Sequence, residues 1–235
     1  MQKIFTLIYL LLIPTIILGE NKFQFESGLG INLNKGNTDK ISERFYLNII
    51  RYTDKLKLLL NLNQIYGESK GIKDTNKGDM TLKCDYDITK QEQPFIFFIS
   101  YYNQFQDIKL RTQTGIGNKH TFYKSEKVDY SISGAILYET MEYLQNKDKG
   151  YLGRLSIRPK IIYNFENFKA KILFFYQPQV NYINDYRMIL DINLEFKIIK
   201  HLFFEFKIFD EYNNIVPENI KRNDLTSYNG IKFKI

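Results

Sequence analysis

Few residues of this 235-residue chain are of the types that carry out covalent or acid–base chemistry. It has two histidines, His120 and His201, and one cysteine, Cys84. A single cysteine excludes a disulfide framework and a cysteine-cluster metal site. A hydrolytic site would need a nucleophile or an aspartate placed beside one of the histidines in space. His120 falls near the end of an alternating run and His201 in a short connection, so we expect both to be solvated or interfacial. We therefore expect no enzyme activity from these residues, and we expect Cys84 to be inert.

Two other groups of residues are of types that bind ligands, but their spacing does not form a binding motif. Asp79, Asp85 and Asp87 lie on alternate positions of one run, so they spread along a face and do not wrap into a calcium-binding loop. Gly115 and Gly117 are not followed by a helical pattern, so they do not form a phosphate-binding loop. The glycines are better explained as relief of crowding on an inner face. We expect no metal and no cofactor.

The most distinctive charged residues are basic. Arg154, Arg158 and Lys160 share one face of an alternating run, and Lys169 and Lys171 share a face of the next run. If the chain turns back at 164–167, Lys160 lies across from Lys171, and like charges directly opposite one another are destabilising unless other groups compensate. The acidic candidates on the neighbouring runs are Asp129, Asp191 and Glu195. These eight residues are therefore the expected lining of an interior, either as a positive stripe that favours anions or as an ion-pair network that fills the space.

The elements that position these charges are predicted to be strands. Between 187 and 198, apolar and polar residues alternate with a period of two, which a helix would scatter around its circumference. The apolar face of this run holds Met188, Leu190, Ile192, Leu194, Phe196 and Ile198, and the polar face holds Arg187, Asp191, Asn193, Glu195 and Lys197. The same alternation recurs along the whole chain after residue 21.

Marking each such run predicts about twelve strands of about 10–14 residues. They lie near 22–34, 40–51, 55–66, 79–89, 94–105, 109–121, 128–139, 151–163, 168–180, 186–198, 202–212 and 224–235. Strands of ordinary globular domains are mostly about 5–6 residues long. Strands that cross a bilayer at a tilt need about 9–11. The length of the runs therefore favours a membrane-spanning barrel.

The connections between the runs also differ by parity. Those from even-numbered to odd-numbered strands are all short, whereas three from odd to even are long and polar: Gly67–Gly78, Thr140–Gly150 and Asn213–Asn223. Short turns at one end and longer loops at the other are typical of outer-membrane barrels, where the turns are periplasmic and the loops extracellular. We expect these three segments to be extracellular.

The first residues have the layout of a secretory signal peptide. Lys3 supplies a positive charge, an apolar run extends from Ile4 to Leu18, and the polar chain begins at Glu20. Pro14 and the shortness of the run argue against a spanning helix. We expect a cleaved signal peptide at 1–19 and a barrel at 20–235. An aromatic share of 16% excludes general disorder, and one long apolar run is too few for a helical membrane bundle.

Three stretches resemble a family of salt-induced outer membrane proteins. They are the opening strand and its Gly-Asn-Thr turn at 28–39, the Arg and paired glycines at 107–117, and the final strand from Asn223. The chain departs from that family in having no tryptophan and in ending on Ile235, where an aromatic residue is usual. The resemblance implies a small outer-membrane barrel and brings no catalytic residue with it.

These observations predict an all-β protein, a single closed antiparallel transmembrane barrel of about twelve strands in the bacterial outer membrane. The expected function is a narrow passive channel for small solutes, anions among them. A structural or surface-interaction barrel with a filled interior is the alternative, because about twelve strands lie between the filled and the open sizes. A soluble periplasmic barrel that carries a lipid would turn the apolar faces inward. The expected partners are outer-membrane lipids, the barrel-assembly machinery and small solutes, with no nucleic acid.

Overall fold

The computed structural model describes residues 22–34, 40–69, 71–145, 149–216 and 220–235. The expected signal peptide at 1–19 lies outside these residues. No helix within the described ranges is long and apolar enough to cross a membrane.

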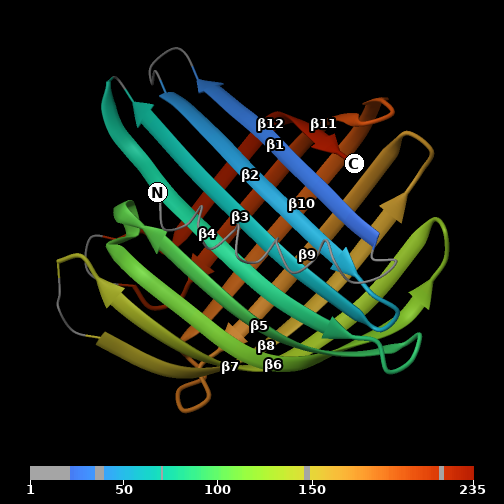
Figure 1. Ribbon diagram of the computed structural model, residues 1–235. Coiled ribbons are helices and arrows are strands. Elements are labelled where there is room, and N and C mark those ends of the chain that lie inside the picture. The colour runs from blue at the N-terminus through green and yellow to red at the C-terminus, as the bar shows by residue number, and fades with distance from the viewer. Residues whose placement is uncertain (1–21, 35–39, 70, 146–148, 217–219) are drawn as a thin grey trace, which may run out of the picture.

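Twelve strands of the described chain form one closed antiparallel barrel (Figure 1). Each strand pairs with its neighbours in sequence, and β1 closes the barrel against β12 with Glu26 opposite Lys234 and Ile31 opposite Asn229. One short 3-10 helix, η2 (Gln104–Gln106), follows β5. The strands are β1 (Lys22–Asn34), β2 (Lys40–Tyr52), β3 (Leu56–Ser69), β4 (Ile72–Tyr86), β5 (Glu92–Asn103), β6 (Ile108–Lys124), β7 (Val128–Tyr143), β8 (Lys149–Asn164), β9 (Phe168–Pro178), β10 (Tyr186–Ile199), β11 (Leu202–Asn213) and β12 (Asn223–Lys234). The predicted barrel and its strand number are confirmed.

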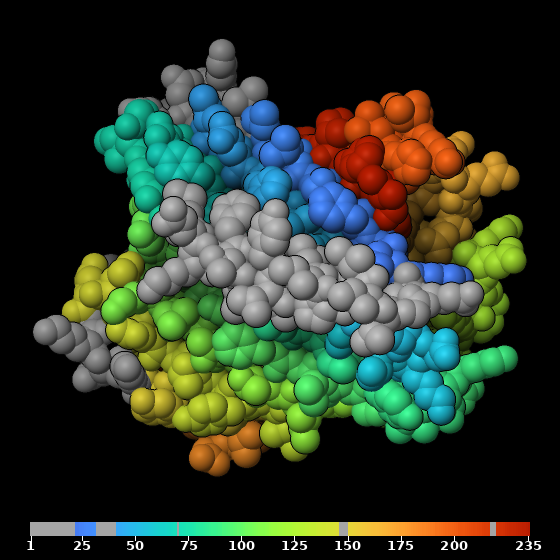
Figure 2. All heavy atoms as spheres, viewed as in Figure 1, coloured from blue at the N-terminus to red at the C-terminus, as the bar shows by residue number. Residues whose placement is uncertain are grey.

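The side chains alternate between an apolar outer wall and a polar inner wall. Leu29 and Ile116 are each 65% exposed on the outside, whereas the inward Glu26 is 8% exposed. On β10, Phe196 is exposed and Glu195 is buried, as the alternation predicts. In Figure 2 the green and yellow side chains of β5 to β8 form a continuous outer surface. The apolar side faces outward, which is the opposite of what a soluble lipid-carrying barrel requires, so that alternative is wrong.

Two of the three expected long loops are mostly strand. Strand β3 continues to Ser69 and β4 begins at Ile72, so most of Gly67–Gly78 is a projecting hairpin. Apart from the exposed Ile72, its described residues are polar or glycine on both faces. Polar residues on both faces removed the alternation on which the prediction of strands relied. Thr140–Gly150 is also mostly strand, because β7 extends to Tyr143 and β8 begins at Lys149, and its connection at 144–148 is no longer than the turn at 87–91. Of the three expected loops, Asn213–Asn223 alone keeps a long connection, at 214–222.

The register of the β8–β9 hairpin also differs from the expectation. The turn has three residues, 165–167, and the backbone N–H of Phe165 donates to the carbonyl of Phe168 at 2.7 Å. Lys160 therefore lies opposite Leu173, and Lys171 lies opposite Ile162. The predicted opposition of Lys160 and Lys171 is wrong. The shift of two residues keeps both lysines on the inner face and separates their charges.

Candidate functional site: the barrel interior

A cluster of arginines and carboxylates lies inside the barrel near the end that carries the odd-to-even connections. We call this the long-connection end. The Arg187 guanidinium lies 2.8 Å from a carboxylate oxygen of Glu139 and 3.3 Å from one of Glu211. Arg111 lies 3.0 Å from Glu211. Arg154 contacts Glu139 at 3.2 Å and Asp185 at 2.9 Å. We call this set the mouth cluster: Arg111, Glu139, Arg154, Asp185, Arg187 and Glu211.

The mouth cluster crosses the interior. Arg111 stands on β6 and Glu211 on β11, and the shorter path between them around the barrel passes four strands, β7 to β10. Their contact therefore joins opposite parts of the wall. Glu139 is fully buried, and Arg187 and Glu211 are each 2% exposed. Neutral groups complete the pairing, since the Gln113 amide donates to Glu139 at 2.5 Å. The cluster narrows the interior at this level.

Other ion pairs join strands on the remaining side of the barrel. Lys77 on β4 contacts Asp224 on β12 at 2.7 Å. Arg44 on β2 contacts Glu205 on β11 at 3.3 Å and lies 4.4 Å from the ring centroid of Tyr46. These contacts span two or three intervening strands, so they too reach across the interior. The inner wall is thus tied together by charge-assisted contacts at several levels.

Aromatic rings cover a pair of glycines halfway along the inner wall. A Cβ on Gly117 would lie 2.6 Å from the Phe95 ring, and one on Gly115 would lie 2.7 Å from the Phe97 ring. The two glycines therefore give the rings room to lie flat against β6. Phe95 itself is 6% exposed. This agrees with the expectation that Gly115 and Gly117 relieve crowding.

The eight expected lining residues all stand at inward positions, but their partners are mostly not those expected. Lys160 lies 3.7 Å from Asp129, which is one of the three candidate acids. Asp191 instead contacts Lys207 at 3.1 Å. Glu195 contacts Lys232 at 2.9 Å. Arg154 belongs to the mouth cluster.

The other three basic residues of the stripe have no ion pair within the described part of the chain. Arg158 donates to the Ser133 hydroxyl at 3.3 Å and lies near two phenyl rings. Lys169 stands directly opposite Glu195, whose carboxylate is bonded to Lys232. Lys171 stands opposite Asn193. The acids that attract these three cations, Asp85, Glu195 and Asp191, are each bonded to another lysine. Positive charge without an ion pair of its own therefore remains on the inner wall of β8 and β9.

Sequence reasoning did not single out most of the mouth cluster. Arg111, Glu139, Arg187 and Glu211 carry one usable signal, which is that each lies at the inward parity of its strand near the long-connection end. Their pairing has no local signal, because Arg111 and Glu211 are 100 positions apart. Only the closure of the barrel brings them together.

The two histidines and the cysteine lie away from the mouth cluster. His120 lies at the short-turn end, with its Nδ1 2.5 Å from Glu92. The Nδ1 of His201 lies 2.9 Å from the backbone carbonyl of Lys234. Within the described ranges, no group of three or more histidine, cysteine or acidic residues has the geometry to hold a metal ion. Cys84 stands on the outer wall.

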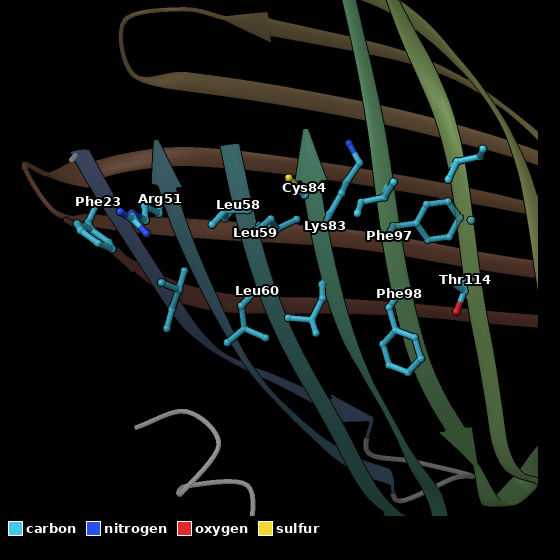
Figure 3. A pocket seen from close by; sticks show the side chains of 15 residues that line it. Phe23, Arg51, Leu58, Leu59, Leu60, Lys83, Cys84, Phe97, Phe98 and Thr114 are labelled. Carbon is cyan, nitrogen blue, oxygen red and sulfur yellow. The ribbon is translucent and has the colours of Figure 1, made fainter. Parts of the chain in front are cut away.

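A shallow apolar pocket lies on the outer wall rather than in the interior (Figure 3). Most of the residues that line it point outward from β1 to β6, including Leu58, Leu60 and Phe98. Arg51 lies at one side of the pocket near Phe23. A concave apolar surface at this position suits contact with hydrocarbon.

Comparisons with known proteins agree with this fold. The NanC porin covers 90% of this chain and 98% of its own, with a TM-score of 0.53 and 8% sequence identity. The translocator domain of the autotransporter NalP from Neisseria meningitidis covers 99% of this chain and 95% of its own, with a TM-score of 0.51 and 9% identity. No curated protein matches significantly in sequence. Residues 27–234 match the model of DUF481, described as a protein of unknown function, so the chain belongs to this family.

Proposed function

We propose that the protein is an outer-membrane channel for small solutes, with a preference for anions. The observation that carries the proposal is the unpaired positive charge on the inner wall at Arg158, Lys169 and Lys171. An unpaired charge buried away from water is strongly destabilising. Three cations without an ion pair on two adjacent strands are therefore easier to explain if water enters the interior than if side chains fill it. Their field would raise the local concentration of anions.

The mouth cluster sets the size limit in this proposal. The contact between Arg111 and Glu211 crosses the interior at 3.0 Å, and Glu139 beside it is fully buried. Permeation therefore requires these contacts to separate transiently, which favours low flux and small solutes. The channel is narrow because charged side chains meet across it, and not because the barrel has few strands.

A structural barrel with a filled interior is the second candidate, and the burial of the mouth cluster favours it. If its contacts never separate, the lumen conducts nothing and the work of the protein falls to its surface. The two candidates differ in one property, which is the permeability of the folded barrel.

Solute entry into proteoliposomes tests the proposal. Vesicles with the purified barrel should swell in isotonic solutions of small solutes, faster for acetate than for neutral solutes of similar size, and should not swell in large sugars. The variant Glu139→Gln should swell faster than the wild type, because it weakens the constriction. Vesicles that swell with neither protein would support the filled barrel.

The location follows from the same proposal. The apolar outer wall would contact outer-membrane lipids, after export through the signal peptide and insertion by the barrel-assembly machinery. We also propose that the chain is a salt-induced member of its family, which transcript levels before and after a rise in external salt would test. No catalytic role is proposed.

A further inference from the structure

Among the arginines on the described inner wall, Arg158 differs in having no carboxylate within ion-pair distance, whereas Arg44, Arg111, Arg154 and Arg187 each have one. The Arg158 guanidinium stands on β8 between the ring of Phe95 on β5, 5.8 Å from the centroid, and the ring of Phe175 on β9, 5.4 Å from the centroid. Its one described hydrogen bond goes to the Ser133 hydroxyl at 3.3 Å. A guanidinium has five N–H donors, so most of them are left for another acceptor.

The carboxylates around Arg158 are already used. Asp85 is near enough to interact with it electrostatically, but Asp85 is bonded to Lys83. Asp129 is paired with Lys160. Each arginine of the mouth cluster contacts at least one carboxylate within 3.3 Å, whereas Arg158 has no such contact.

Further positive charge surrounds the same place. Lys171 on β9 and Arg158 are near enough to repel each other. The ammonium of Lys83 lies 4.3 Å from the centroid of the Phe95 ring, but Asp85 neutralises it, so the excess positive charge is that of Arg158 and Lys171. An excess of cations around partly apolar space is stabilised when an anion enters it. The rings contribute an apolar surface, which a hydrated inorganic ion would not use.

We infer that Arg158, Lys171, Ser133, Phe95 and Phe175 form a binding site for a small organic carboxylate with an apolar body. The carboxylate would take the free edge of the guanidinium, whose geometry matches two carboxylate oxygens. The apolar body would lie against Phe95 and Phe175. The inference rests on the proposed function, because the solute must enter the interior to reach the site.

Calorimetric titration of the folded, detergent-solubilised barrel with benzoate tests the site. We expect saturable binding by the wild type, at least tenfold tighter for benzoate than for benzyl alcohol, which has the ring without the charge. Arg158→Gln should weaken benzoate binding at least tenfold. Arg158→Lys should retain only part of the affinity, because it keeps the charge and loses the planar pair of donors. Lys200→Gln, at an exposed turn, is the matched control and should bind as the wild type does.

Three results would overturn the site. They are undiminished benzoate binding by Arg158→Gln, equal binding of benzyl alcohol and benzoate by the wild type, and competition by sulfate as effective as that of benzoate. Heat-dependent mobility on a denaturing gel shows whether each variant is folded, and Arg158→Lys serves if Arg158→Gln does not fold. The titration needs no flux. Binding without vesicle swelling would keep the site and reject the channel, and swelling without binding would do the reverse.

Discussion

Glu139 is the hub of the mouth cluster, and replacing it tests whether the cluster is a buried ionic junction. Its carboxylate accepts from Arg187 at 2.8 Å, from Arg154 at 3.2 Å and from Gln113 at 2.5 Å. Glu139→Gln keeps the shape of the side chain and removes its charge. Two arginines then lose a shared counter-charge at a position with no exposure to solvent.

The expected loss of stability can be worked out from the remaining contacts. Removing one partner of a buried ion pair costs about 3–5 kcal/mol. Arg187 keeps Glu211 at 3.3 Å, and Arg154 keeps Asp185 at 2.9 Å. The loss should therefore fall at the lower end of the range, about 3 kcal/mol, which is roughly two powers of ten in the folding equilibrium. With a urea slope of about 3 kcal/mol per molar, the midpoint of unfolding should fall by about 1 M.

Urea unfolding of the barrel in detergent, followed by its mobility on an unheated gel, measures this loss. Glu142→Gln on the same strand is the control, because the Glu142 contact with Lys109 is partly open to solvent, with 29% and 57% of the side chains exposed. Such surface pairs contribute about 0–1 kcal/mol. Equal losses for the two variants would refute the buried junction and indicate a water-filled mouth.

Three further outcomes are expected. In a Cys84→Ser background, a cysteine at Lys73 in the β3–β4 hairpin should react with an impermeant thiol reagent on intact cells, and one at Lys90 should not; the reverse pattern would mean an inverted barrel. Gly117→Ala should lower the urea midpoint, because the added Cβ would lie 2.3 Å from a backbone carbonyl oxygen, whereas Gly134→Ala meets nothing within 4 Å and should not; equal midpoints would count against the packed rings. Any anion preference should weaken as salt rises from about 0.1 M to 1 M, because the screening length falls from about 10 Å to about 3 Å; a preference independent of salt would exclude charges in a wet lumen.

The strands of the barrel were predictable from the sequence, because the alternation that marks a strand is visible within that strand alone. A strand between lipid and an interior must alternate, and residues 187–198 do so at every position but Ile189. The three-residue turn at 165–167 was misjudged by one residue, which moved the β8–β9 register by two positions. The hairpin around Ser69 and Ile72 was missed because alternation disappears where both faces of a strand are polar.

The pairing inside the barrel was not predictable in the same way. Lys160 and Asp129 stand on adjacent strands, and Asp129 is one of the candidate partners that the sequence offers for the basic residues. Glu211 meets Arg111 across the interior, and that contact depends on the cross-section and tilt of the closed barrel. Asp191 and Glu195 had several lysines within reach, and their choice of Lys207 and Lys232 followed from side-chain geometry that no sequence spacing encodes.

The reversal potential of single channels in a planar bilayer tests the central proposal most directly. With a gradient of KCl across the membrane, the wild-type barrel should give small unitary currents whose reversal potential favours chloride over potassium. The triple variant Arg158→Gln, Lys160→Gln, Lys171→Gln should fold and shift that potential toward potassium. A folded wild-type barrel that shows no unitary current at any salt concentration would contradict the channel.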